Sequence, residues 1–206
     1  MTTMPGHSSL SVEFLVLAYS NGYFPMADPD SGVISWYSPD PRAIIPIETY
    51  TPSRNLRRTI RRGVFRVTLN SAFREVVAGC AAREDTWISA EIVEAYGRLH
   101  ERGYAHSVEA WREDRLAGGL YGVALGGAFF GESMFSRESE ASKVTFAFLV
   151  HHLRQRRFIL LDTQFMNPHV LQFGAMEIPR TRYLEILAQA LELPCSLNEC
   201  GELSAP

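Results

Sequence analysis

The chain of 206 residues has little cysteine, a single lysine and no long hydrophobic run. Its three cysteines are an odd number without metal-ligand spacing, so we expect neither disulfides nor a metal site. The longest apolar stretch, FAFLVHHL, contains two histidines and is far shorter than the ~20 residues that cross a bilayer. The N-terminus lacks the basic, apolar and small-residue segments of a secretory signal. These absences predict a cytoplasmic protein with no membrane contact.

What the chain does contain is enough apolar sequence for a full core. Hydrophobic residues make up 46% of it, which predicts a globular protein with one domain, or one large and one small domain. The net charge of -3 hides an asymmetry, because residues 51–66 contain six arginines and no acid. Arginine provides nineteen of the twenty basic residues, so genome composition explains the general excess of arginine as well as function does.

The periodicity of apolar residues predicts an α+β protein. Helices are expected over residues 9–21, 53–63, 71–82, 89–102, 141–156 and 181–191, with a short one around His169. Strands are expected within residues 32–48, 64–70, 106–113, 116–125, 127–135, 158–163 and 175–179, and the short turns after residues 113 and 125 predict an antiparallel meander. We therefore expect a small N-terminal α/β domain with the basic helix, residues 1–62, and a largely antiparallel sheet flanked by helices, residues 63–206.

The segment FILLDTQFMN places two polar residues at the end of an apolar strand. Because side chains alternate along a strand, Asp162 and Gln164 are expected on one face, with Leu161 and Thr163 on the other. A structural interpretation is that Asp162 caps the strand end or accepts hydrogen bonds from the following turn. A second polar strand, GESMFSRESEASK at residues 131–143, suggests instead that the two strand ends line a pocket.

Two tryptophans, Trp36 and Trp87, lie in turn-rich segments. So large a ring wastes apolar area if it is exposed, so each tryptophan either closes a seam between subdomains or covers a binding site.

Seven segments together resemble the leucyl/phenylalanyl-tRNA-protein transferase family: FPMAD, WYSPDPRAIIP, EDTWIS, HSVEAW, GGLYGVALGGAFFGESMFSRESEASK, LLDTQFMNPHV and FGAMEIPRTRYL. They occur in order between about Ser9 and Leu191. The resemblance implies a small N-terminal domain and an acetyltransferase-like (GNAT) domain. It also implies transfer of leucine or phenylalanine from aminoacyl-tRNA to proteins with an N-terminal arginine or lysine, which marks them for N-end-rule degradation. We expect a monomer.

The same resemblance implies roles for individual residues. Gln164 would accept a hydrogen bond from the attacking amine, Asp162 would orient the Gln164 amide and draw charge toward itself, and Glu132 would hold the amine or the basic side chain of the acceptor. Trp36 and Trp87 would stack on the terminal adenosine or close the pocket. The pocket for the donor side chain would be formed by Leu120, Phe129, Met134, Phe146, Leu149, Leu153 and Leu161. Leu120 and Leu149 stand where methionine and phenylalanine often occur, so methionine is a further candidate donor.

The basic helix matches the basic patch with which the family contacts tRNA. Its arginines Arg54, Arg57, Arg58, Arg61 and Arg62 would bind phosphates. A solvated amphipathic helix is the alternative, which the lack of any acid makes weaker.

Two other functions stay open. One is a CoA-dependent acyltransferase, but the segment SRESEASK has no glycine with which to hold a pyrophosphate, so we expect no cofactor. The other is a noncatalytic RNA-binding module, in which the arginines matter and Asp162 and Gln164 do not.

Overall fold

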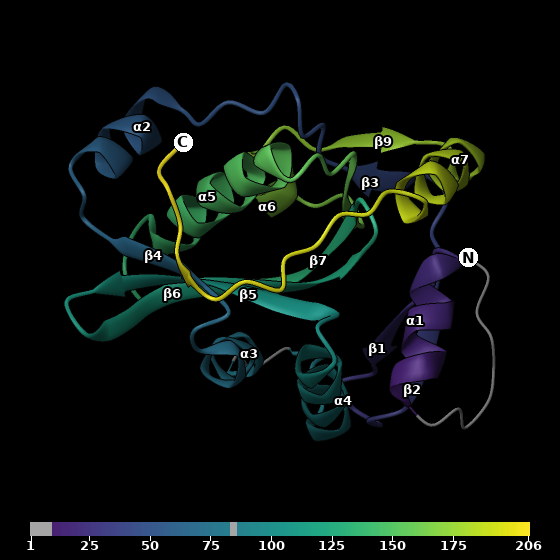
Figure 1. The fold of residues 1–206 in the computed structure, drawn as a ribbon. Helices are drawn as coiled ribbons and strands as arrows, with labels where there is room; N and C mark the ends of the chain where they lie inside the picture. Colours follow the sequence, from purple (N-terminus) through teal and green to yellow (C-terminus); the bar gives the residue numbers. More distant parts are fainter. Residues whose placement is uncertain (1–9, 83–85) are drawn as a thin grey trace.

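A computed structural model describes residues 10–82 and 86–206 of the chain. Within these ranges, helices and strands alternate over most of the length (Figure 1). The helices are α1 Val12–Ser20, α2 Arg54–Arg61, α3 Phe73–Ala81, α4 Ala90–Glu101, α5 Ala141–Gln155, α6 Pro168–Leu171 and α7 Arg180–Leu191. The strands are β1 Phe24–Ala27, β2 Ile34–Tyr37, β3 Arg42–Ile44, β4 Arg66–Leu69, β5 Ala105–Arg112, β6 Arg115–Leu125, β7 Ala128–Ser136, β8 Leu160–Gln164, β9 Met176–Ile178 and β10 Gly201–Glu202.

The strands form two sheets. The small sheet is the β1–β2 hairpin, and the large sheet has the order β10-β4-β5-β6-β7-β8-β3-β9. All pairings are antiparallel except that of β7 with β8. The predicted α+β class and the meander β5–β6–β7 are confirmed.

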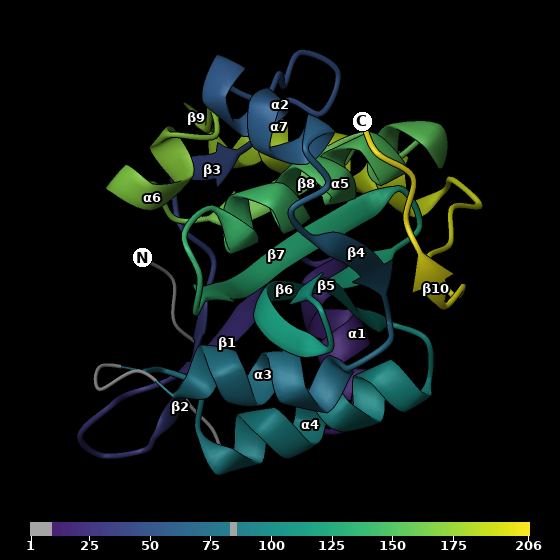
Figure 2. The same cartoon turned by 90° about the vertical axis from the view of Figure 1, so that its left-hand side faces the viewer.

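Helices cover both faces of the large sheet. Figure 1 shows α2, α5 and α6 above the sheet and α3 and α4 below it, and Figure 2 shows the same layers from the side. Two hydrophobic cores follow from this arrangement. The first core packs α1, α3, α4 and α7 with the small sheet against one face, and the second packs α2 and α5 against the other.

Serine caps begin three of the helices, and two of these, α2 and α4, begin at the serine from which the sequence predicts them. Ser11, Ser53 and Ser89 each accept a hydrogen bond from the main-chain N–H three residues later, at the start of α1, α2 and α4. Gly22 and Gly63 follow α1 and α2 with positive φ angles of 77° and 59°, which glycine adopts without strain. The predicted start of the first helix at Ser9 lies outside the described residues, as does part of the segment between the helices predicted over residues 71–82 and 89–102.

Two strands were not predicted. The β1 strand contains Pro25 and is four residues long, and β10 has two residues that are held by pairing with β4. Neither is long enough to show an alternating pattern. The segment of residues 38–41 joins β2 in the small sheet to β3 in the large sheet, and both strands lie within the range expected for strands, residues 32–48.

The expected division of the chain after residue 62 stays a prediction. Two elements before that point pack with the larger part of the protein: β3 lies between β8 and β9, and α2 contacts α5.

The parallel pair β7 and β8 creates the space for a site. The pairing runs only from Ala128 opposite Leu160 to Phe130 opposite Asp162, although β7 continues to Ser136 and β8 to Gln164. Beyond Phe130 the two strands therefore part. In the described portion of the chain, no helix is long and apolar enough to cross a membrane.

Candidate active site

A cavity of about 450 Å³ lies where β7 and β8 part. Strands β6, β7 and β8 provide one side of it, and α5 and the region of α6 provide the other. Most of its walls are apolar, and the polar groups Glu132 and Gln164 lie at its surface. An apolar cavity with a few convergent polar groups is typical of a small-molecule site.

Most of the residues predicted for the pocket line this cavity. They are Leu120, Phe129, Met134, Phe146, Leu149 and Leu161 among the apolar residues, with Trp87, Glu132 and Gln164. Further apolar residues of the wall were not predicted from the sequence, among them Met26, Ile45, Phe165, Val170 and Phe173. Leu153, which was predicted for the wall, is not among the residues that line the cavity and is fully buried in the second core.

Trp36 does not lie where its predicted role requires. Its side chain is 2% exposed and packs edge-on against Phe14 of α1, with the ring centres 5.1 Å apart. It belongs to the first core and does not line the cavity. In this conformation it cannot stack on an adenosine, and it fills the seam between α1 and the small sheet. Trp87 is half-buried and lines the cavity, so the structure separates the two tryptophans.

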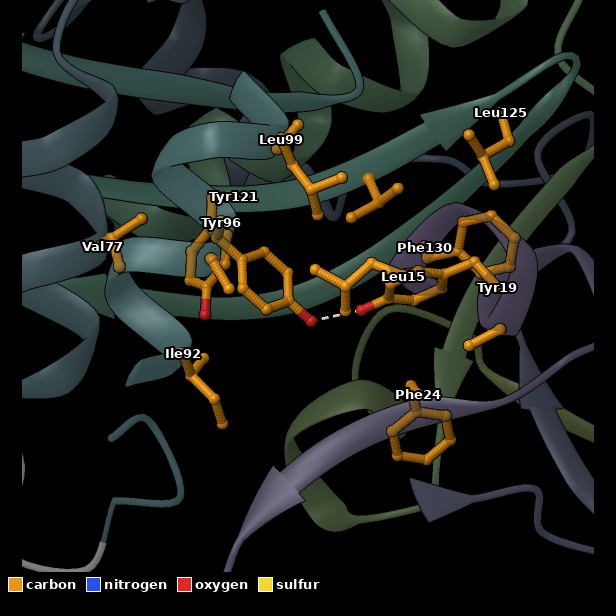
Figure 3. Packing of buried hydrophobic residues seen from close by; sticks show 14 of the residues in the cluster. Leu15, Tyr19, Phe24, Val77, Ile92, Tyr96, Leu99, Tyr121, Leu125 and Phe130 are labelled. Carbon is orange, nitrogen blue, oxygen red and sulfur yellow. Dashed lines mark hydrogen bonds between the residues drawn. The ribbon is translucent and has the colours of Figure 1, made fainter. Parts of the chain in front are cut away.

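Glu132 on β7 is the centre of a buried hydrogen-bond network. The Tyr19 hydroxyl donates to its Oε1 at 2.7 Å, the Tyr96 hydroxyl donates to its Oε2 at 3.0 Å, and the Gln164 Nε2 donates to its Oε1 at 3.0 Å. The two tyrosine hydroxyls also contact each other inside the first core (Figure 3). Because the Gln164 amide nitrogen donates to Glu132, the amide carbonyl remains as the acceptor of Gln164.

Burial changes the protonation of this network. It raises the pKa of Glu132 to about 7, although the hydrogen bonds from Tyr19, Tyr96 and Gln164 lower it. Burial, together with the Glu132 carboxylate, raises the pKa of both tyrosines well above the usual value, so both hydroxyls stay protonated. Glu132 is thus a carboxyl group that can take up a proton near neutral pH.

Asp162 has a different environment from Glu132. It is 0% exposed and pairs with Arg42 of β3, whose Nη2 lies 2.6 Å from its Oδ2. Its Oδ1 accepts the main-chain N–H of Gln164 at 2.8 Å. We expected Asp162 to orient the Gln164 side-chain amide, and this detail is wrong: Glu132 holds the amide, and Asp162 holds the main chain.

The backbone of Gln164 is unusual at this point. Its φ of 68° lies in the left-handed region, which costs a non-glycine residue about 1–2 kcal/mol. Ala43 of β3 is opposite Gln164 and Ile44 is opposite Asp162, so Thr163 is an extra residue on β8. Asp162 and Gln164 still contact side chains of the first core, Tyr183 and the Glu132 network, whereas Leu161 belongs to the second. Gln164 also lines the cavity, together with Leu161 and Thr163, whereas Asp162 does not, so the expected common face of Asp162 and Gln164 stays a prediction.

The five predicted phosphate-binding arginines lie on one exposed helix. Arg54, Arg57, Arg58, Arg61 and Arg62 are all exposed, and Leu56 anchors α2 in the second core. Three of them line a hollow of about 420 Å³ with Ile60 and Pro206. Helix α2 packs against α5, which provides Phe146 and Leu149 to the cavity.

Four buried polar residues of the site were missed in the sequence: Tyr19, Arg42, Tyr96 and Tyr183. The three tyrosines fit the apolar pattern of their helices, and only the charge of Arg42 in an apolar strand indicates a buried partner. Among the described residues, no cluster of three or more histidine, cysteine or acidic side chains could hold a metal ion.

Two family models match the chain. The N-terminal domain of leucyl/phenylalanyl-tRNA protein transferase matches residues 8–40, and leucyl/phenylalanyl-tRNA protein transferase matches residues 44–188. Curated relatives with this name include one from Chlorobium limicola, 54% identical over 86% of this chain and 93% of its own. Another, from Salinibacter ruber, is 48% identical over 96% of this chain and 89% of its own.

Among solved structures, that of L-PGS from Bacillus licheniformis covers 76% of this chain and 51% of its own at 12% identity, with a TM-score of 0.44. The sequence identity to the curated relatives is far higher, at 48% and 54%. The N-terminal family model and the larger family model match consecutive parts of the chain, residues 8–40 and 44–188. The chain therefore belongs to the leucyl/phenylalanyl-tRNA protein transferase family.

Proposed function

We propose that this protein transfers leucine or phenylalanine from aminoacyl-tRNA to the α-amino group of proteins that begin with arginine or lysine. The single observation that carries this proposal is the Gln164–Glu132 pair at the surface of an apolar cavity of about 450 Å³. Membership of the transferase family supports the reaction class.

An aminoacyl ester already carries the free energy that peptide-bond formation needs. The protein has to align two substrates, keep the amine neutral and accept its proton, and no nucleophilic serine or cysteine is required. An α-amino group titrates near 8 and a lysine side chain near 10.4, so at pH 7 roughly a tenth of the former is neutral but well under a thousandth of the latter. This difference favours the chain terminus.

Gln164 and Glu132 divide the remaining work. The carbonyl of the Gln164 amide accepts a hydrogen bond from the attacking amine, because the amide nitrogen already donates a hydrogen bond to Glu132. The Glu132 carboxylate attracts the cationic acceptor residue, and with a pKa of about 7 it can take the proton that the amine releases.

The apolar walls hold the donor side chain. Leu120, Phe129, Phe146 and Leu149 give a surface that suits leucine and phenylalanine alike. One methylene contributes about 1–3 kcal/mol of discrimination in such a pocket, so the leucines at positions 120 and 149 leave methionine as a third candidate donor. The half-buried Trp87 is placed to stack on the terminal adenosine, which contributes about 1–3 kcal/mol per base.

Four further properties of the protein are part of the same proposal. They are a GNAT-like fold of the larger domain, independence of CoA, action as a monomer, and a cytoplasmic location, where aminoacyl-tRNA is made. Transfer of a bulky hydrophobic residue to an N-terminus would mark the acceptor for N-end-rule degradation.

A three-donor assay tests the reaction. Radiolabelled leucyl-, phenylalanyl- and methionyl-tRNA are each incubated with the protein and a peptide that begins with arginine. We expect leucine and phenylalanine to move to the peptide, and a peptide with an acetylated N-terminus to receive nothing, because the amine is the nucleophile. A protein that binds the tRNA and moves no label is an RNA-binding module, and this result would refute the proposed function.

The arginines of α2 give a second prediction. Replacing Arg57 or Arg61 with alanine should weaken tRNA binding and lower the slope of log affinity against log salt by about 1 for each arginine removed. Filter binding between 50 and 200 mM salt, concentrations at which such contacts change affinity strongly, measures the slope. Arg182→Ala on α7, another exposed helical arginine, is the matched control and should leave the slope unchanged. Equal slopes for all three variants would remove α2 from the RNA-binding surface.

A further inference from the structure

The Asp162 carboxylate accepts four hydrogen bonds. Its Oδ1 accepts from the Nε of Arg42 at 2.9 Å and from the main-chain N–H of Gln164 at 2.8 Å. Its Oδ2 accepts from the Nη2 of Arg42 at 2.6 Å and from the hydroxyl of Tyr183 at 2.7 Å. A carboxylate has about four acceptor positions, so these donors occupy all of them. With 0% of the side chain exposed, Asp162 has no position left for a substrate proton or for the Gln164 side chain.

Arg42 is fixed as firmly as the carboxylate that it pairs with. Its side chain is 1% exposed, and its guanidinium lies 4.8 Å from the ring centre of Phe24 and 4.5 Å from that of Tyr183. Its Nη1 donates to the carbonyl of Gly22 at 2.9 Å. The ion pair therefore joins the start of the small sheet, the β3–β8 pair and helix α7 at one point.

This junction controls the conformation of Gln164. The main chain of Gln164 is in the left-handed region, where a non-glycine residue stays only if its surroundings hold it. The hydrogen bond from its N–H to Asp162 is such a restraint, and Arg42 and Tyr183 fix the carboxylate that accepts it. The consequence is the direction of the Gln164 side chain, whose Nε2 reaches Glu132 across the sheet.

We propose that Arg42 and Asp162 are positioning residues that hold the backbone of Gln164 in its strained conformation, and that the Asp162 carboxylate takes no part in proton transfer. This inference rests on the proposed function, in which the Gln164 amide receives the acceptor amine. It predicts that the charge of Asp162 is needed only because Arg42 is charged. A neutral pair that keeps the two hydrogen bonds to the Oδ1 of residue 162 should therefore work.

The chain permits such a pair. In Arg42→Gln the amide nitrogen stands at the same point along the side chain as the arginine Nε, which donates to Asp162 Oδ1. In Asp162→Asn the side-chain carbonyl can still accept the N–H of Gln164. Each single change leaves one buried charge without its partner, which displaces the strand end, whereas the double change leaves none.

The test is steady-state transfer of labelled leucine or phenylalanine to an arginine peptide by wild type, Arg42→Gln, Asp162→Asn and the double variant. We expect each single variant to lose about 10²-fold in kcat, the usual effect of a displacement of about 1 Å, with a similar KM for aminoacyl-tRNA. The double variant should recover most of this loss. Arg112→Gln, which removes the exposed ion pair with Glu138, is the matched control and should retain wild-type kcat.

Each other outcome contradicts the inference. A double variant that melts near the wild-type temperature and is as slow as Asp162→Asn would show that the carboxylate charge itself is catalytic. A single Arg42→Gln variant with wild-type kcat would show that the ion pair positions nothing. If the single variants do not fold, the double variant alone decides, because its kcat is compared with wild type. Failure of the proposed function is separate: there the wild type moves no label at all.

Discussion

Replacement of Gln164 with alanine is expected to lower the rate of transfer by about 10²-fold or more while tRNA binding stays close to wild type. The cause is the loss of the polar group that is proposed to accept the amine at the surface of the cavity. Removal of one preorganised hydrogen-bonding group from an active site typically costs 10²–10³-fold in kcat. The arginines of α2, which are proposed to bind tRNA, are not changed by this substitution. Single-turnover transfer from preformed phenylalanyl-tRNA measures the chemical step, and filter binding measures the affinity.

Gln189→Ala provides the control for this experiment. Gln189 is an exposed residue of α7, so the same change of side chain there should alter neither the rate nor the melting temperature. Transfer by Gln164→Ala at the wild-type rate would remove the catalytic assignment and leave the apolar cavity as a binding site only. Loss of both transfer and tRNA binding would indicate a general structural defect.

Replacement of Glu132 with glutamine should lower kcat/KM for an arginine peptide by about 10- to 100-fold. Hydrogen bonds to charged groups contribute about 1.5–3 kcal/mol, and the variant has no charge with which to attract the cationic acceptor. In wild type, transfer should rise with pH through about 7 as Glu132 ionises, and this step should be absent from the variant. Initial rates between pH 5.5 and 8.5 would reveal it, while the titration of the acceptor amine near 8 remains in both profiles.

The same substitution should stabilise the protein at high pH. Burial raises the folded-state pKa of Glu132 to about 7 from an ordinary value of 4.5, so the folded state binds the proton more tightly than the unfolded state does. Stability from this group is full below 4.5 and is lost as pH rises to 7, by up to about 3 kcal/mol. Glutamine has no such titration. Glu132→Gln should therefore unfold at higher urea than wild type at pH 8 and at a similar concentration at pH 4.5.

Glu91→Gln on the exposed face of α4 is the matched control for both measurements. It should change neither the pH profile nor the difference in stability between pH 4.5 and pH 8. An unchanged pH profile in Glu132→Gln would show that another group produces the step near neutral pH.

Much of the fold could be predicted because its helices and strands carry local signals. A serine precedes the first turn of α1 and of α2, and a glycine follows the last turn of each, so these signals lie next to the helix ends that they mark. The meander has short turns and long strands. The strands β1 and β10 lack such signals, because pairing with another segment is what makes them strands. The order of the large sheet, with β3 between β8 and β9, likewise depends on partners far along the chain.

The candidate site divides in the same way. By itself the sequence determined which residues resemble the family, and so the apolar wall, the arginines of α2 and the pair Glu132 and Gln164. Only the tertiary structure decided that Trp36 is buried in the first core and that Asp162 holds the main chain of Gln164. It also decided that Tyr19 meets a carboxyl group 113 residues away and that Arg42 meets one 120 residues away. The physical reason is that a periodic pattern records which residues are buried, whereas the partners of a buried polar group are fixed only when distant segments pack together.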